Sequence, residues 1–432
     1  MNLFTIAWKS IRQRLLASSL TALSIALGVA LMITVLVING VVSRMFNQTA
    51  TGYDLIIGPP KGSPLQLVLS TIFFVDRPIG TLPYKEYIRF RDNKAVEYAV
   101  PYALGDTTAD GRYRIVGTLP RYFDHEYIPG KMLQFAQGGK LKNSFDSVIG
   151  ARVARDYGWK PGHEFPVAHG GNKDDIHDEK FTVVGILKPT GTPIDRAVFI
   201  HFNGFFEIPG HLKPLSEAEA KEKAFGIQDL PEPNPNVPQD EVEADKKVDI
   251  RQKEVSAILV RTKALTYTIM IKSAVNNDSV AQAANPMEQI NRLMSSFVGN
   301  VRIALVVMTA MIILVSGVGI FVSIYNSMSD RRREIAIMRA LGASRTTVFS
   351  IIIAESVLLC MGGGLFGILL GHGLVFVAVP FVEERSDLYI NPWSFEPQEL
   401  FLIPALIVMA VVVGLIPALT AYRADVARNL QE

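Results

Sequence analysis

The chain has 432 residues, and its 43 Lys and Arg residues nearly balance its 41 Asp and Glu residues. This balance leaves no broad basic field of the kind that nucleic-acid binding requires, so we expect no nucleic-acid partner. Hydrophobic residues make up 49% of the chain and are gathered into blocks, a pattern that is typical of a membrane protein.

Four apolar blocks are each long enough to cross a bilayer, which requires roughly 20 apolar residues. We predict transmembrane helices at residues 16–42, 301–328, 347–380 and 399–422. The other segments are then an N-terminal helix at 1–15, a large domain at 43–300, short loops at 329–346 and 381–398, and a tail at 423–432. A cleavable signal peptide is the competing interpretation of the first block, but that block is long and no small-residue cleavage site follows it.

Basic residues beside the predicted helices orient the chain. They gather before the first helix, in the loop 329–346 and after the fourth helix, and include Lys9, Arg12, Arg14, Arg423 and Arg428. With four crossings these clusters share one side of the membrane, and the positive-inside rule makes that side cytoplasmic. Both termini are then cytoplasmic and residues 43–300 are extracytoplasmic. The single cysteine, Cys360, lies in the third helix, so we expect no intrachain disulfide.

The large domain has the pattern of an α+β fold. Runs of β-branched and aromatic residues between Gly and Pro predict strands near 53–60, 113–119, 181–189, 197–202 and 256–262. Apolar residues at helical spacing predict helices within 83–93, 144–158 and 265–276. The stretch 213–253 is rich in charge and proline, and we predict a mobile insertion there. The fold class is therefore a polytopic α-helical membrane protein with four transmembrane helices and an α+β extracytoplasmic domain between the first two.

The loop between the second and third spans contains a distinctive motif, SDRRREIAIMRALGASRTTVFSIIIAES, at residues 329–356. We expect a short helix here with an apolar side formed by Ile335, Ile337, Met338 and Leu341. Such a helix can insert an apolar stripe into a groove on a partner protein, and Gly342 would end it. A helix lying on anionic lipid is the alternative.

This motif, in its place between the second and third of four spans, resembles the cytoplasmic coupling segment of MacB/FtsX-like ABC transporter permeases. The flanking sequences WKSIRQRLL and GLIPALTAYRA also resemble that family, whereas a D-P dipeptide common near its C-terminus is missing. The resemblance implies that a cytoplasmic ATPase contacts Arg331, Arg332, Arg333, Glu334, Ile335, Met338, Arg339, Leu341, Gly342 and Arg345.

The resemblance also implies a bacterial inner-membrane permease with a MacB-like periplasmic domain. Two copies would pair and bind two ATPase subunits, and the movement of those subunits would be transmitted through the membrane. The printed sequence contains no G-x-x-x-x-G-K-[ST] motif, so ATP and Mg²⁺ would bind to the partner ATPase. We expect this chain to bind no cofactor of its own and not to be an enzyme.

Small residues in the third span predict close helix packing, either within one chain or across a dimer. They are Gly362, Gly363, Gly364, Gly367 and Gly371. The same span contains Glu355 and His372, for which we favour structural roles, with Glu355 pairing with a neighbouring helix or reaching the cytoplasmic interface.

Two segments of the large domain are candidate sites. An apolar run after the first span could contact substrate or simply pack the domain, and its residues are Leu65, Leu67, Val68, Phe73 and Phe74. A loop further on contains His169, Asp174 and His177, a set of ligand types that suits zinc. On sequence alone a solvated acidic loop is favoured over a zinc site.

Two classes of function remain open. The first is ATP-driven export or extraction of a lipoprotein, lipid, peptide or hydrophobic compound. The second is a signalling scaffold that moves no substrate and activates a periplasmic partner such as a cell-wall hydrolase, or a metal-linked envelope system. A transporter should have an apolar groove between paired large domains, whereas a scaffold should have a docking site for a soluble protein. The size of the large domain favours transport.

Overall fold

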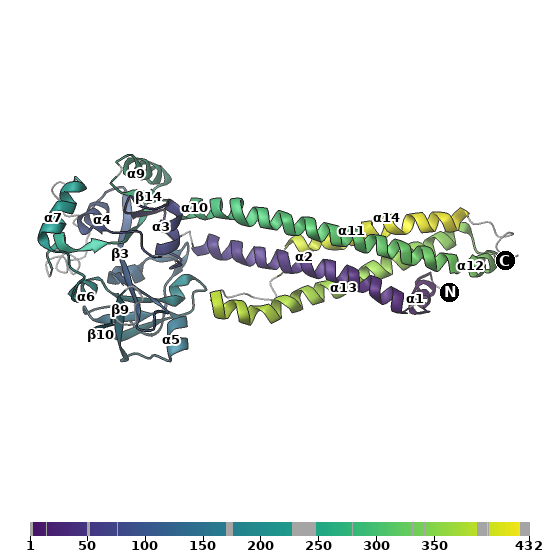
Figure 1. Cartoon of the computed structure of the whole chain (residues 1–432), viewed down its shortest axis with the longest axis horizontal. Helices are drawn as coiled ribbons and strands as arrows, with labels where there is room; N and C mark the ends of the chain where they lie inside the picture. Colours follow the sequence, from purple (N-terminus) through teal and green to yellow (C-terminus); the bar gives the residue numbers. More distant parts are fainter. Residues whose placement is uncertain are drawn as a thin grey trace. The chain divides into compact units, whose positions relative to one another are not determined.

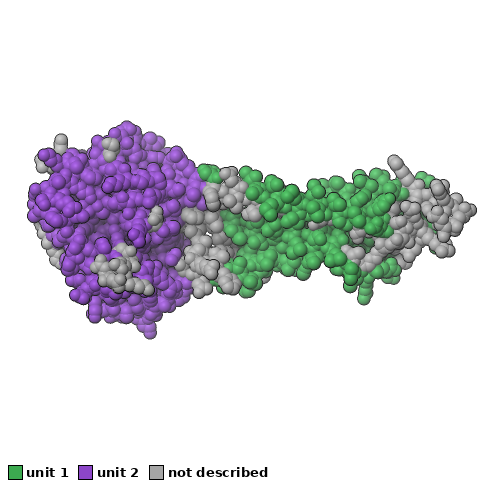
Figure 2. Space-filling view, viewed as in Figure 1, with its two compact units in different colours: residues 1–43, 295–432 green, residues 44–294 purple. Residues whose placement is uncertain are grey.

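The computed structural model describes residues 3–13, 15–49, 52–75, 77–169, 176–226, 248–278, 280–330, 332–340, 342–386, 395 and 397–423. The chain divides into two compact units, which Figure 2 colours separately. One unit contains residues 1–43 and 295–432, and the other contains residues 44–294. We call the second unit the α/β domain.

The first unit is helical, as Figure 1 shows. Its α-helices are α1 (Leu3–Gln13), α2 (Leu15–Thr49), α11 (Gly299–Asp330), α12 (Arg332–Ala340), α13 (Arg345–Ser386) and α14 (Leu402–Arg423), with a π-helical turn η4 (Met294–Val298) before α11 and a 3₁₀ turn η5 (Pro397–Phe401) before α14. Within the described residues, four stretches are long and apolar enough to span a membrane: Ser18–Gly40, Val306–Asn326, Arg345–Pro380 and Glu399–Thr420. Helix α13, which contains the third span, continues to Ser386. The short loop predicted to start at residue 381 therefore begins later.

Three glycines of α13, spaced four residues apart, form one face that packs against α2. A Cβ atom on any of them would come within 3.0 Å of an α2 atom, so only glycine allows this approach. Their α2 neighbours include the backbone oxygens of Ala22, Ala26 and Ala30, which face Gly363, Gly367 and Gly371 respectively. Gly364 faces α14 instead, where a Cβ would lie 2.3 Å from Leu406. These four glycines therefore pack within one chain.

The titratable groups inside α13 have partners on other helices of the same unit. The hydroxyl of Ser10, on α1, donates a hydrogen bond to Glu355 Oε1 at 3.0 Å, and Glu355 is buried. His372 Nε2 lies 3.1 Å from a carboxylate oxygen of Glu399, at the start of the last span. Both groups thus connect helices.

The α/β domain is built on a twisted sheet. Within the described residues it has ten strands, in the order β14-β1-β13-β3-β4-β11-β8-β10-β7, with β9 paired to both β10 and β3. The strands are β1 (Leu55–Gly58), β3 (Val96–Thr108), β4 (Arg114–Thr118), β7 (Phe135–Gly138), β8 (Asp146–Ile149), β9 (Glu164–His169), β10 (Ile176–Leu187), β11 (Ala197–His201), β13 (Ala257–Thr262) and β14 (Gln282–Ala284). Two small pairs lie apart from it: β2 (Leu82–Pro83) with β12 (Glu254–Val255), and β5 (Glu126–Ile128) with β6 (Lys131–Met132).

Helices cover the sheet (Figure 1). They are α3 (Pro64–Thr71), α4 (Tyr84–Arg91), α5 (Ala151–Tyr157), α6 (Phe202–Glu207), α7 (Leu215–Ala224), α9 (Leu265–Asn277) and α10 (Pro286–Leu293), with 3₁₀ turns η1 (Pro120–Asp124), η2 (Pro193–Arg196) and η3 (Ile250–Gln252). Alternate residues of β13 enter two separate cores: Ile258 and Val260 belong to one, and Ala257 and Leu259 to the other. Because side chains of a strand alternate between faces, the sheet has an apolar core on each side.

Two details of the domain differ from the sequence prediction. The helix predicted within residues 144–158 is the short helix α5 alone, and strand β8 precedes it, with Gly150 between them. A Cβ on Gly150 would lie 2.4 Å from the backbone oxygen of Asp195, so this junction needs a glycine. The ends of the stretch 213–253 are packed: the Lys221 ammonium lies 2.6 Å from Glu254, and Lys253 is fully buried. Residues 227–247, the rest of the predicted insertion, lie outside the described residues.

Candidate functional site

The helix α12 carries the motif of the loop between the second and third spans. Its apolar side chains point in different directions. Ile335 is buried in the apolar core of the helical unit and Met338 packs against that core, whereas Ile337 is 45% exposed. The prediction of one apolar stripe was therefore wrong, because residues two apart lie on opposite sides of a helix. Ile337 is therefore the large apolar residue of α12 that is exposed and available for contact.

The C-terminal end of α12 is formed as the sequence predicts. Gly342 has a φ of +103°, in the region that favours glycine. Its amide donates to Arg339 O at 3.1 Å, and the next amide, of Ala343, donates to Met338 O at 3.0 Å. This pair of bonds is a Schellman motif, which fixes the direction in which the chain enters α13.

The other residues expected to contact an ATPase lie in the first turn of α12, at the start of α13, or outside the described residues. Arg332, Arg333 and Glu334 form the first turn of α12, and Arg331 and Leu341 lie outside the described residues. The Arg345 guanidinium lies 5.8 Å from the centre of the Tyr422 ring, a cation–π contact between the start of α13 and the end of α14. Arg345 therefore also holds two spans together at this end of the helical unit.

The segment predicted to contact substrate mostly belongs to a core of the α/β domain. Helix α3 begins after Ser63, whose hydroxyl accepts a hydrogen bond from the Gln66 amide. Leu67, Val68 and Phe73 are buried, while Leu65 and Phe74 are half-buried. Three of the five candidate residues thus pack a core of the domain, which is the packing alternative that the sequence left open, and they present no exposed surface to a substrate.

The histidines of the predicted metal loop converge with two residues that the sequence did not indicate. Asp106 of β3 pairs directly with His169 of β9, so their side chains share a face of the sheet. The neighbouring pair in the β9–β10 ladder is Ala168 with Ile176, so His169 and His177 both point to the opposite side of that ladder. Strand register therefore brings two imidazoles and one carboxylate together.

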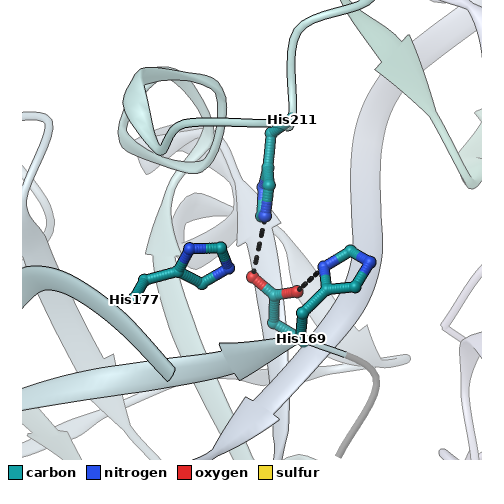
Figure 3. Close-up of side chains that lie close together, drawn as sticks. His169, His177 and His211 are labelled. Carbon is teal, nitrogen blue, oxygen red and sulfur yellow. Dashed lines mark ion pairs between the residues drawn. The ribbon is translucent and has the colours of Figure 1, made fainter. Parts of the chain in front are cut away.

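A third imidazole completes this cluster, which we call the His3Asp cluster: Asp106, His169, His177 and His211. His211 lies between α6 and α7, directly after Gly210, whose φ is +88°. Figure 3 shows the three labelled rings converging on one carboxylate. His169 Nδ1 and His211 Nε2 lie 3.2 and 3.5 Å from the Asp106 oxygens, and one ligand atom from each of the four residues lies within 4.8 Å of every other.

Burial differs among the four residues. Asp106 is fully buried and the His211 side chain is 3% exposed, whereas the His169 side chain is 56% exposed. The predicted ligand Asp174 lies outside the described residues. The sequence did offer one signal for Asp106: it is a carboxylate in the second half of a strand whose other carboxylate, Glu97, is exposed near the start. His211 carried none, because only the fold brings its loop to the β9–β10 hairpin.

Two family models match the chain. The FtsX-like permease C-terminal model matches residues 306–426, and the MacB-like periplasmic core domain model matches residues 18–286, which is more than half of the chain. The first match contains three of the four spans, together with α12. The second contains the remaining span and nearly all of the α/β domain.

Curated relatives resemble the chain in the same regions. It is 26% identical over 433 residues to an uncharacterised ABC transporter permease of Methanocaldococcus jannaschii, covering 96% of this chain and 93% of the relative. It is 22% identical over 394 residues to the macrolide export ATP-binding/permease protein MacB of Rhodopirellula baltica, covering 86% of this chain and 54% of the relative. The MacB protein of Brucella melitensis is 24% identical over 393 residues, with 86% and 52% covered. The chain thus spans about half the length of these MacB relatives.

Proposed function

Because this chain belongs to the MacB/FtsX family of ABC transporter permeases, we propose that it relays the movement of a separate ATPase subunit through the membrane to its α/β domain. The observation that carries this proposal is the geometry of α12, a short helix between two spans. One face of α12 is anchored in the core of the helical unit, while Ile337 is exposed on another. A force applied to α12 is therefore passed directly to the spans that pack against it.

The spans support a mechanical relay better than a polar pathway. Away from the ends of the described spans, the titratable side chains are Glu355, His372 and Cys360, and the first two have partners on other helices. Pathways for ions and polar substrates usually need several ionisable groups facing a cavity. Tight glycine packing between α13 and α2 couples these helices, so that they move together.

The charges beside the spans support an orientation for the chain. We propose that α12 and both termini face the cytoplasm and that the α/β domain faces the periplasm, with the chain in the bacterial inner membrane. The basic residues beside the spans support this orientation through the positive-inside rule. ATP and Mg²⁺ would bind to the ATPase subunit, because the sequence has no Walker A motif.

We further propose that two copies pair and that the cargo is a lipoprotein, lipid, peptide or hydrophobic compound. The spans in α11 and α14 are only 21% and 22% buried within the chain, against 56% for that in α2. These apolar faces are available to lipid and to a second copy. The MacB relatives carry macrolide export in their names, which supports an apolar cargo.

Association with the ATPase tests the proposal. The tagged chain is purified in detergent with the ATPase subunit, and Arg339→Glu is compared with Lys160→Glu, an exposed charge reversal in the α/β domain. We expect the Arg339 variant to lose ATPase association while its α/β domain stays folded, and the Lys160 variant to retain both. ATPase association and activity at the wild-type level in the Arg339 variant would contradict the proposal.

A further inference from the structure

The His3Asp cluster has the ligand chemistry of a zinc site. Three imidazole nitrogens with one carboxylate oxygen make a tetrahedral set that suits zinc, whereas Ca²⁺ and Mg²⁺ prefer oxygen ligands. Three of the seven histidines in the chain meet at this point. We propose that Asp106, His169, His177 and His211 together bind one zinc ion.

The distances in the cluster are close to those that zinc requires. Ligand atoms bound to one tetrahedral zinc ion at 2.0 to 2.2 Å lie about 3.3 Å apart. His169 Nδ1 is already 3.2 Å from one oxygen of Asp106, and His211 Nε2 is 3.5 Å from the other. All four ligand atoms lie within 4.8 Å of one another, so binding requires small side-chain adjustments and no rearrangement of the sheet.

Burial of the residues in the cluster also indicates that an ion binds there. Nε2 of His177 is buried and has no hydrogen-bond partner among the described residues. A buried nitrogen without a partner is costly, and a metal ion would satisfy it. Asp106 is fully buried, so a bound cation would offset the cost of desolvating its carboxylate. The partly exposed His169 gives an ion a route from solvent.

The elements that supply the ligands define what the ion does. Asp106 lies in the central sheet, His169 and His177 lie in the β9–β10 hairpin, and His211 lies in the α6–α7 connection. A zinc ion would link these segments, which are far apart in sequence, in a domain that contains no cysteine. Four protein ligands leave no open position for a reacting water, so the ion has a structural or regulatory role and not a hydrolytic one. This role does not depend on the ATPase partner.

Zinc binding is measured on the full-length chain in detergent, purified without a polyhistidine tag. The chain is stripped with a chelator, incubated with ZnSO₄ and desalted, and its metal content is determined by mass spectrometry. We expect one zinc ion per chain and a higher thermal unfolding midpoint than in the stripped protein. X-ray absorption should report nitrogen and oxygen ligands without sulfur.

Substitutions of single histidines test which residues bind the zinc ion. Competition with a chromophoric chelator should show that His169→Ala and His211→Ala weaken zinc binding by more than about 100-fold, since losing even an outer-shell partner costs 10- to 100-fold. His169→Ala changes a partly exposed residue. Its unfolding midpoint in the stripped state, compared with that of the stripped wild type, separates loss of the ligand from loss of the fold. His163→Ala, an exposed histidine outside the cluster, is the matched control and should bind zinc like the wild type. The proposal is overturned if the wild type retains no zinc, or if His169→Ala binds zinc as tightly as His163→Ala.

Discussion

Gly367 of α13 lies so close to α2 that a Cβ atom on it would be 2.6 Å from the backbone oxygen of Ala26. Replacing it with Val should therefore separate the two helices and destabilise the helical unit by about 1–3 kcal/mol, the usual cost of overpacking. Thermal unfolding in detergent measures this effect. Gly373→Val is the matched control, because nothing lies within 4 Å of a Cβ there, and it should behave like the wild type. Equal unfolding midpoints for both variants would contradict the packing described.

The buried hydrogen bond between Ser10 and Glu355 makes a second prediction. Ser10→Ala removes one donor to the buried Glu355 carboxylate and should lower the stability of the helical unit by about 1–3 kcal/mol. Ser19→Ala is the control, since the Ser19 hydroxyl is exposed and donates back to Leu16 O of its own helix. If both substitutions lower the unfolding midpoint by the same amount, the hydrogen bond between α1 and α13 does not stabilise the helical unit, and the prediction is wrong.

His125 gives the α/β domain a dependence on pH. Its ring stacks on Tyr98 with 3.6 Å between ring centres, and burial lowers the pKa of His125 to about 4. The imidazole of an unfolded chain titrates near a pKa of about 6.5. Between these values the unfolded chain binds the additional proton, so this residue's contribution to stability is present above about pH 6.5 and is lost as the pH falls toward 4.

His125→Phe should keep the stacking and remove this titration. As the pH falls from 6.5 to 4, we expect the free energy of unfolding to decrease by about 1–2 kcal/mol less in the variant than in the wild type. This figure allows for partial screening of the imidazole by solvent. Denaturant unfolding at several pH values, followed by near-ultraviolet circular dichroism, measures the difference. The exposed His163→Phe serves as the comparison. An unchanged pH profile in His125→Phe would show that burial of this imidazole is not linked to folding.

Much of the fold could be predicted because it depends on local sequence. Uninterrupted apolar blocks predict the spans, and the β-branched runs at 197–202 and 256–262 became β11 and β13. Gly342 was recognisable because it follows an apolar helical pattern and ends α12 with a positive φ. The prediction that Ile335 and Ile337 share one face of α12 was wrong, because residues two apart lie on opposite sides of a helix.

The His3Asp cluster was only half predictable for a different reason. His169 and His177 lie close together in the sequence, which suggested that they meet. Asp106 and His211 join them only through strand pairing and the path of the chain after α6. Contacts of this kind leave no periodicity in a single sequence. The direction of the glycine face of α13 was also open until the structure showed it packing against α2.

The most direct test of the proposed relay is crosslinking from α12 to the ATPase subunit. The single native cysteine is first replaced by Cys360→Ser, and a photoreactive maleimide is then attached at Ile337→Cys, which is exposed, or at Ala336→Cys, which is buried. We predict that the Ile337 position crosslinks to the ATPase and resists labelling by an impermeant maleimide added to intact cells, while the Ala336 position does not crosslink. Labelling of the Ile337 position from outside the cell, with no crosslink to the ATPase, would contradict the relay.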